Sequence, residues 1–177
     1  MAVYSPREDS YFLSEVLGDY LKGFDKGIRV LDMGSGSGIQ ADTCRRLGFE
    51  NVVVVDIDEE AVLFLKKKKF NVIKSDLFSN VEGRFDLIIF NPPYLPNHKY
   101  DMGRDTAGGK EGYETILEFL KQAKFHLRKG GRVLLLYSSL SKPRVIKGEA
   151  KKLGYKIDVL SERSFFGEEL FIVELSL

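Results

Sequence analysis

The residues of this chain whose types and spacing best suit chemistry are Asn91, Pro92, Pro93 and Tyr94. They follow an apolar run, 85–90, which is typical of a parallel strand buried on both faces. Consecutive prolines stiffen the backbone and remove two N–H donors, and the Asn91 side chain adds an acceptor oxygen. Two fixed acceptors beside an aromatic ring would grip a planar NH2 group. The segment therefore predicts a site for chemistry on an amide or exocyclic nitrogen, although it also suits a plain turn after a strand.

A glycine loop, Asp32 to Gly38, forms a second candidate site between a predicted strand and a predicted helix. Glycines at 34, 36 and 38 would let the backbone turn tightly and approach a ligand. Their spacing differs from the Gly-x-Gly-x-x-Gly of dinucleotide sites, because Ile39 stands where the third glycine would be. The Asp32 carboxylate beside the loop suits a cationic amine better than a pyrophosphate. These features predict a nucleoside ligand with a positively charged amino-acid tail, such as S-adenosylmethionine.

Two further acids end the second and third predicted strands. Asp56 follows the glycine loop by about 20 residues, where a carboxylate could bind ribose hydroxyls. Asp76 could accept a hydrogen bond from an adenine amino group, with Leu77 packing nearby. Each acid taken alone is more often a turn or helix-capping residue. Three acids at successive strand ends beside a glycine loop favour a ligand site.

Strand and helix patterns alternate along the chain. The predicted strands are 28–31, 51–55, 72–73, 85–90, 132–137, 155–160 and 170–175, and the predicted helices are about 6–22, 39–47, 59–68, 113–127 and 142–153. Ser5 is the expected N-cap of the first helix, and Glu8 would close a capping box. Repeated units of this length predict an α/β fold with a doubly wound, mostly parallel seven-stranded sheet. The last two strands, joined by a polar loop without a helix, would add one antiparallel strand. We expect one domain over 1–177, with the N-terminal helix packed on it.

Composition excludes several classes of protein. The 177 residues are 44% hydrophobic, with 27 basic and 26 acidic side chains, so a full core is expected and disorder is not. The single cysteine, Cys44, allows no internal disulfide, and the two histidines, His98 and His126, are far apart, so no metal site is expected. No signal peptide or membrane-spanning run is evident, which predicts a cytoplasmic protein. The balanced charge offers no support for nucleic-acid binding without excluding it, and Lys66–Lys69 is typical of a solvated helix end.

The chain resembles the class I S-adenosylmethionine-dependent methyltransferases, which are Rossmann-like, over essentially its whole length. Within them it is similar to the HemK family, the glutamine N5-methyltransferases of peptide-chain release factors, in its short archaeal and eukaryotic branch. Four segments carry the resemblance: Pro-Arg-Glu-Asp-Ser at 6–10, the glycine loop at 30–38, Asn-Pro-Pro-Tyr at 91–94 and the glycine-rich 107–112. The glycine loop is common to the superfamily, whereas the opening motif and the last segment indicate the release-factor branch.

The resemblance implies a set of site residues. The implied cofactor contacts are Ser10, Asp32, Gly34, Gly36, Gly38, Asp56, Asp76, Leu77 and Asn91; the implied catalytic residues are Asn91, Pro92 and Tyr94; and Asn91, Pro92, Pro93 and Tyr94 would hold the substrate. The Asn91 side-chain oxygen and the Pro92 carbonyl would each accept one N–H of a glutamine amide, with Tyr94 packed on its plane. The amide nitrogen would attack the sulfonium methyl, and S-adenosylhomocysteine would leave. The methylated nitrogen must then lose one proton, for which no side chain of the sequence is an obvious general base.

The resemblance also implies two partners, a release factor as substrate and a small zinc-binding activator protein. An exposed sheet edge near Val72 and Ile73 is a candidate docking surface for the activator. The alternative function is methylation of a nucleic-acid base, at adenine N6 or guanine N2, with Tyr94 stacking on a flipped base. The segment from Gly103 to Gly112 suits either a substrate lid or a surface loop.

Overall fold

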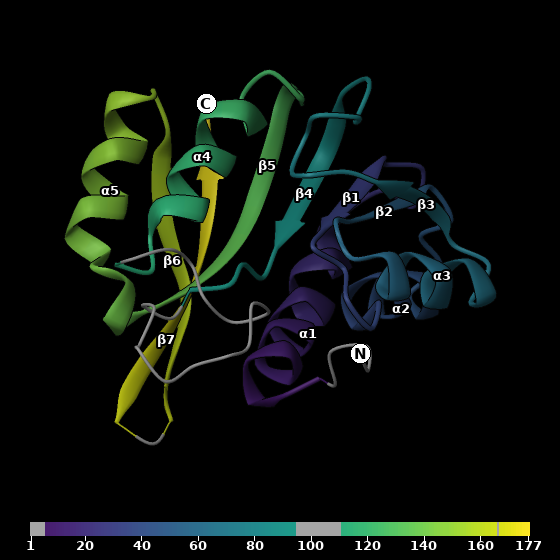
Figure 1. The fold of residues 1–177 in the computed structure, drawn as a ribbon. Coiled ribbons are helices and arrows are strands. Elements are labelled where there is room, and N and C mark those ends of the chain that lie inside the picture. The colour runs from purple at the N-terminus through teal and green to yellow at the C-terminus, as the bar shows by residue number, and fades with distance from the viewer. Residues whose placement is uncertain (1–5, 95–110, 166) are drawn as a thin grey trace.

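A computed structural model describes residues 6–94, 111–165 and 167–177 of the chain. Its seven strands form one sheet in the order β3-β2-β1-β4-β5-β7-β6 (Figure 1). The strands are β1 Val30–Met33, β2 Val52–Asp56, β3 Asn71–Lys74, β4 Phe85–Phe90, β5 Leu127–Ser138, β6 Lys156–Phe165 and β7 Glu168–Ser176. The helices are α1 Glu8–Tyr20, α2 Ile39–Arg46, α3 Glu59–Lys67, α4 Glu114–Ala123 and α5 Pro143–Lys152, with short 3-10 turns η1 Leu21–Gly23 and η2 Ser139–Ser141.

The pairing of the strands confirms the predicted fold class. Strands β1 to β5 pair in parallel, whereas β7 runs antiparallel to both β5 and β6. Every residue of β1 and β2 is buried, as expected for parallel strands that are covered on both faces. The sheet is therefore doubly wound and mostly parallel, with one antiparallel strand.

The two faces of the sheet carry separate hydrophobic cores. Leu31, Ile88 and Val133 lie on the face covered by α4 and α5. Their strand neighbours point the other way, toward α1, α2 and α3; Val30 and Ile89 are examples. Figure 1 shows the two groups of helices well separated. This alternation follows from the two-residue period of a strand, and it leaves the carboxyl ends of β1, β2 and β4 together at one edge.

Helix α1 packs on α2, but its start differs from the prediction. It begins at Glu8 instead of Pro6, and its N-cap is Arg7, which makes no side-chain capping bond. Ser5, the expected N-cap, lies outside the described residues, so a capping box is not part of the described helix. Packing holds α1 in place: Phe12 is buried, and the hydroxyl groups of Ser14 and Thr43 are 2.6 Å apart.

The C-terminal third holds more strand than predicted. α4 ends at Ala123 instead of 127, and β5 begins at Leu127, five residues early, through an irregular pairing with β4. The polar loop expected at 161–169 is mostly a hairpin of β6 and β7. Arg163 donates to both carboxylate oxygens of Glu15 on α1, at 3.0 Å each, and Phe165 contacts the Phe12 ring. These contacts join the end of the hairpin to α1, and local sequence does not encode them.

Residues 6–94, 111–165 and 167–177 contain neither a membrane-spanning helix nor a cluster of metal-binding side chains. No helix there is long and apolar enough to cross a membrane, since the longest, α1, has 13 residues. No group of three or more His, Cys, Asp and Glu side chains there is placed to hold a metal ion.

Candidate active site

The predicted site residues gather at the carboxyl edge of the parallel strands. Asn91 follows β4 directly, and the last residue of that strand, Phe90, pairs with Met33 at the end of β1. Asp32 lies one residue before the end of β1, and Asp56 ends β2. Ligands bind at this edge of open α/β sheets, so the fold places the tetrapeptide and two of the three acids where a ligand is expected.

The Asn91 side chain has a defined orientation. Its Nδ2 donates to Asp9 Oδ2 at 3.0 Å and lies 3.5 Å from Ser10 Oγ. Because a carboxylate only accepts hydrogen bonds, the NH2 group must face Asp9 and Oδ1 must point away. Asn91 Oδ1 is buried and has no hydrogen-bond partner within the described part of the chain. A buried acceptor without a partner costs about 1–3 kcal/mol, so this oxygen is well suited to an N–H donor of a ligand.

Asp9 is a site residue that sequence reasoning missed. It lies 82 residues from Asn91 and is 7% exposed. The available signal was its place in the 6–10 motif, from which only Ser10 was assigned a role. Ser10 is also buried, and its carbonyl accepts from Gln40 Nε2 at 2.9 Å. The first turn of α1 therefore touches both the tetrapeptide and α2.

The tetrapeptide is fastened at its far end as well. The Tyr94 carbonyl accepts from Ser141 Oγ at 2.8 Å, and Ser141 is fully buried in the turn after β5. Pro92 is buried, whereas Pro93 and the Tyr94 side chain are half-buried. No peptide bond in the described ranges is cis. Contacts at both ends and two prolines between them make a rigid segment, as positioning of a substrate amide would require.

The glycine loop is held to the end of β2 by the side chain of Asp56. Asp56 Oδ2 accepts from the Gly36 N–H at 2.7 Å, and Oδ1 accepts from the Asp58 N–H at 2.9 Å. Burial raises the pKa of this carboxyl. A carboxylate has about four acceptor positions, so these two hydrogen bonds do not use up its capacity to accept from ligand hydroxyls. Gly34 and Gly36 both adopt positive φ, +62° and +50°, which a side chain would disfavour.

Asp32 is a buried carboxyl group with no cation beside it. It is 2% exposed and accepts one hydrogen bond from the Ala41 N–H at 3.2 Å. Burial raises its pKa to about 7. No ion pair to Asp32 occurs among residues 6–94, 111–165 and 167–177. A ligand with a cationic amine would supply the missing charge, so this site fits the amino-acid tail of S-adenosylmethionine.

Gly38 is packed against the core. Its φ is +77°, and an added Cβ would lie 2.8 Å from Leu65 Cδ2 and 3.4 Å from the Phe70 ring. The position therefore needs glycine for packing, apart from any contact with a cofactor, which stays a prediction.

We expect Gly38→Ala to lower the free energy of unfolding by about 1–3 kcal/mol more than Gly48→Ala does. Gly48 is the matched control, because its φ of +86° carries the same backbone strain with nothing within 4 Å of an added Cβ. Urea denaturation of both variants would measure the difference. Equal losses would show that Leu65 and Phe70 yield freely and that packing does not select glycine at 38.

Asp76 and Leu77 lie in the turn after β3. Asp76 is exposed, and its carbonyl accepts from the Ser79 N–H at 3.1 Å. Leu77 is half-buried against the core and has a φ of +45°, which is uncommon for a residue with a side chain. Such conformations concentrate at functional sites. Their proposed contact with an adenine ring stays a prediction.

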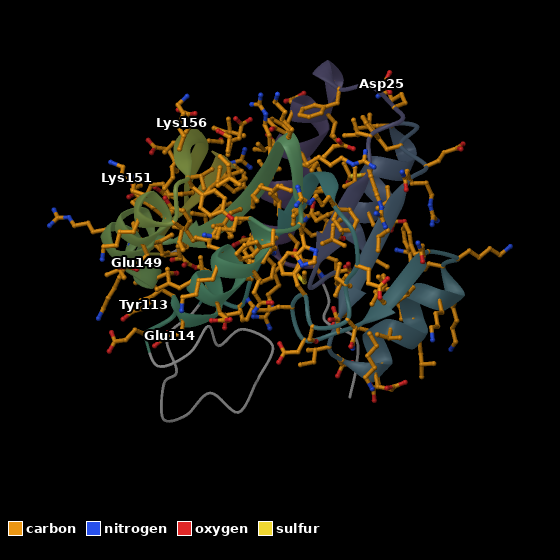
Figure 2. All side chains as sticks on the ribbon, turned by 90° about the horizontal axis from the view of Figure 1, so that it is seen from above. Asp25, Tyr113, Glu114, Glu149, Lys151 and Lys156 are labelled. Atoms are coloured by element: carbon orange, nitrogen blue, oxygen red, sulfur yellow. The ribbon has the colours of Figure 1, made fainter. Side chains whose placement is uncertain are left out.

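His98 and most of the segment from Gly103 to Gly112, which suits either a substrate lid or a surface loop, lie outside the described residues. After it, the Glu114 carboxylate accepts from the Glu111 and Tyr113 N–H groups at 3.0 and 3.1 Å. Figure 2 shows Tyr113 and Glu114 together at the start of α4. Glu111 also pairs with Lys142, so the start of α4 is tied to α5.

Comparisons with known proteins agree with this geometry. The family model described as "Methyltransferase small domain" matches residues 10–154. A protein of Methanocaldococcus jannaschii, provisionally named a protein N5-glutamine methyltransferase, is 37% identical over 97% of this chain and 90% of its own length.

Two solved structures are informative. The E. cuniculi Mtq2-Trm112 complex, described as responsible for methylation of the eRF1 translation termination factor, matches with a TM-score of 0.82 and 26% identity, covering 99% of this chain and 98% of that one. The 16S rRNA N2 G1207 methyltransferase RsmC of T. thermophilus, in complex with AdoMet and guanosine, matches with a TM-score of 0.69 and 25% identity. That match covers 96% of this chain but 43% of the larger enzyme.

Proposed function

The chain belongs to the methyltransferase small domain family, and from that premise we propose that it methylates the side-chain amide nitrogen of glutamine in the Gly-Gly-Gln segment of a peptide-chain release factor. Its relatives establish the reaction class and the cofactor: the chain is an S-adenosylmethionine-dependent N-methyltransferase. The proposal concerns the acceptor. It is supported by the M. jannaschii relative, by the Mtq2 fold neighbour and by the chemistry of Asn91.

The observation that carries the proposal is the buried Oδ1 of Asn91, which has no hydrogen-bond partner among residues 6–94, 111–165 and 167–177. An amide nitrogen is a poor nucleophile, because its lone pair is delocalised into the carbonyl. The cofactor supplies an activated methyl group on a sulfonium. The protein must orient the amide nitrogen and hold its N–H bonds. Asn91 Oδ1 would accept one N–H and the Pro92 carbonyl the other, while Tyr94 would pack on the amide plane. Rigid positioning of this kind can lower a barrier by several kcal/mol, up to about 7–11 in ideal cases.

A small zinc-binding activator is part of the proposal, with the cytoplasm as the site of action. The Mtq2 neighbour is a complex with Trm112, which supports an activator of this kind. Strand β3 is its proposed docking surface, because within the described part of the chain it ends the sheet and pairs with β2 alone. Val72 and Ile73 in this strand are half-buried, and its free backbone edge could pair with a strand of a partner.

The test is methyl transfer from radiolabelled S-adenosylmethionine to an archaeal-type release factor in the presence of cell extract. We expect label on the intact factor and none after its Gly-Gly-Gln glutamine is replaced. The Asn91→Ala enzyme in the same extract controls for methyltransferases that the extract contributes. Repeating the reaction with purified activator in place of extract would test the partner separately.

The same experiment tests the alternative function. The RsmC neighbour acts on guanine N2, and the same site could hold a flipped base with Tyr94 stacked on it. Label that appears in RNA or DNA instead of the release factor would assign the enzyme to adenine N6 or guanine N2 methylation. The exposed charges do not favour this outcome, since the chain is nearly neutral.

A further inference from the structure

We propose that Asp9 is a positioning residue for methyl transfer: its carboxylate holds the Asn91 amide in the single orientation that presents Oδ1 to the methyl acceptor. This proposal rests on the proposed function in one respect: the turnover that is measured is methyl transfer to the proposed acceptor. Asp9 lies on α1, far from Asn91 in the sequence, and its side chain contacts that of Asn91 directly.

The geometry gives Asp9 control of the amide. Asn91 Nδ2 lies 3.0 Å from Asp9 Oδ2, and both side chains are at least partly buried. The terminal torsion of an asparagine is broad and nearly two-fold, so its O and NH2 can exchange places at little intrinsic cost. The partner at the NH2 group therefore decides which atom faces the site. The carboxylate of Asp9 accepts and cannot donate, whereas the hydroxyl of Ser10, at 3.5 Å, could do either.

The orientation matters for the reacting lone pair. When Asn91 Oδ1 faces the methyl acceptor, it accepts a hydrogen bond from one N–H of the substrate nitrogen. The lone pair of that nitrogen then stays free to form the new N–C bond. With the amide flipped, the NH2 group would donate to that same lone pair and remove it from reaction. A flipped amide would also place the Asn91 N–H donors against the N–H donors of the substrate nitrogen, and no hydrogen bond could form between them. An unflipped amide is thus a requirement of the chemistry.

The surroundings keep Asp9 in place. It lies in the first turn of α1, where the helix macrodipole favours a carboxylate. The next residue, Ser10, is tied to α2 through the Gln40 side chain at 2.9 Å. The first turn of α1 is therefore fixed against α2, and the Asp9 carboxylate on that turn has a fixed position relative to Asn91.

Three variants test this role at saturating cofactor and acceptor. Asp9→Ala should lower turnover by roughly 10- to 100-fold, since small errors of position cost about that much. Its dissociation constant for S-adenosylmethionine should stay within about threefold of wild type. Asp9→Asn can turn either an oxygen or an NH2 group toward Asn91, so it should recover turnover only in part, to a level between those of Asp9→Ala and wild type. Asp19→Ala removes an exposed acid from the same helix and should leave turnover unchanged.

Three results would overturn the proposal. Turnover of Asp9→Ala within threefold of wild type would remove any positioning role. A loss of cofactor affinity equal to the loss of turnover would make Asp9 part of the cofactor pocket. An Asp9→Asn variant with full wild-type turnover would show that Asn91 is oriented without a partner that can only accept hydrogen bonds.

A spectroscopic readout separates this proposal from the choice of substrate. The Asn91 side-chain NH2 resonances, identified by their absence in Asn91→Ala, should show slowed hydrogen exchange in wild type. They should exchange rapidly in Asp9→Ala. A wild-type enzyme inactive on the release factor would count against the proposed function alone, and unchanged exchange in Asp9→Ala would count against Asp9 alone.

Discussion

Replacing Asn91 with alanine is expected to lower methyl transfer at least about 100-fold while leaving cofactor binding nearly intact. The amide nitrogen becomes positively charged as the methyl group arrives, so its N–H bonds grow more acidic. Acceptance of an N–H by Asn91 Oδ1 therefore strengthens toward the transition state and lowers the barrier to the chemical step. Loss of a single preorganised polar contact of this kind in other enzymes costs about 10²–10³ in turnover.

The measurement is single-turnover transfer to the release factor together with calorimetric titration of S-adenosylmethionine. Asn80→Ala is a matched control, because Asn80 is an exposed asparagine whose side chain only donates to the Lys74 carbonyl. We expect it to behave as wild type in both assays. Near-normal turnover in Asn91→Ala would remove Asn91 from the mechanism and with it the main support for the proposed function.

The second large effect concerns Asp32, where cofactor binding and stability should move in opposite directions. Asp32→Asn should weaken S-adenosylmethionine binding, because the ligand amine loses its counter-charge. At pH 8 the same change should raise the free energy of unfolding of the ligand-free protein. The carboxyl is 2% exposed, and the fold leaves its negative charge without a described cation.

The sign follows from the pKa of Asp32, which burial raises to about 7 from an ordinary value of 3.8. The folded protein holds a proton that the unfolded chain releases, so wild-type stability falls as pH rises from about 4 to about 7. The loss is at most about 4 kcal/mol, at about 1.4 kcal/mol per pH unit. Asparagine does not titrate, so the variant should gain this amount at pH 8 and gain little at pH 4.5.

Urea denaturation at both pH values, with cofactor titration between pH 6 and pH 8, measures these effects. Wild-type affinity should strengthen as pH rises and Asp32 ionises, whereas the weaker affinity of Asp32→Asn should stay flat. Asp19→Asn is the control, because Asp19 is an exposed acid that pairs with Lys22. A stability gain that is equal at pH 4.5 and pH 8 would contradict a buried charge as its cause.

The order and type of the elements were determined by the sequence alone. Two-residue and 3.6-residue periods of apolar side chains are local properties, and they predicted the seven strands and the five main helices. The same local chemistry marked the glycine loop and the Asn91 tetrapeptide, because prolines and glycines restrict the backbone wherever they occur. The parallel order of the sheet then placed Asp32, Asp56 and Asn91 at one edge.

Only the tertiary structure decided which partners those residues have. The bond from Asn91 to Asp9 spans 82 positions, and no period or motif spacing predicts it. The contact of the β6–β7 hairpin with α1, through Arg163 and Glu15, likewise spans 148 positions of the sequence. The raised pKa of Asp32 depends on burial, which appears only when the helices close over the sheet. Hydrogen bonds and desolvation depend on which groups are close in space, and the separation of two residues along the chain does not determine how close they are in the fold. The residue types were therefore readable from the sequence, whereas their orientation and charge state came from the fold.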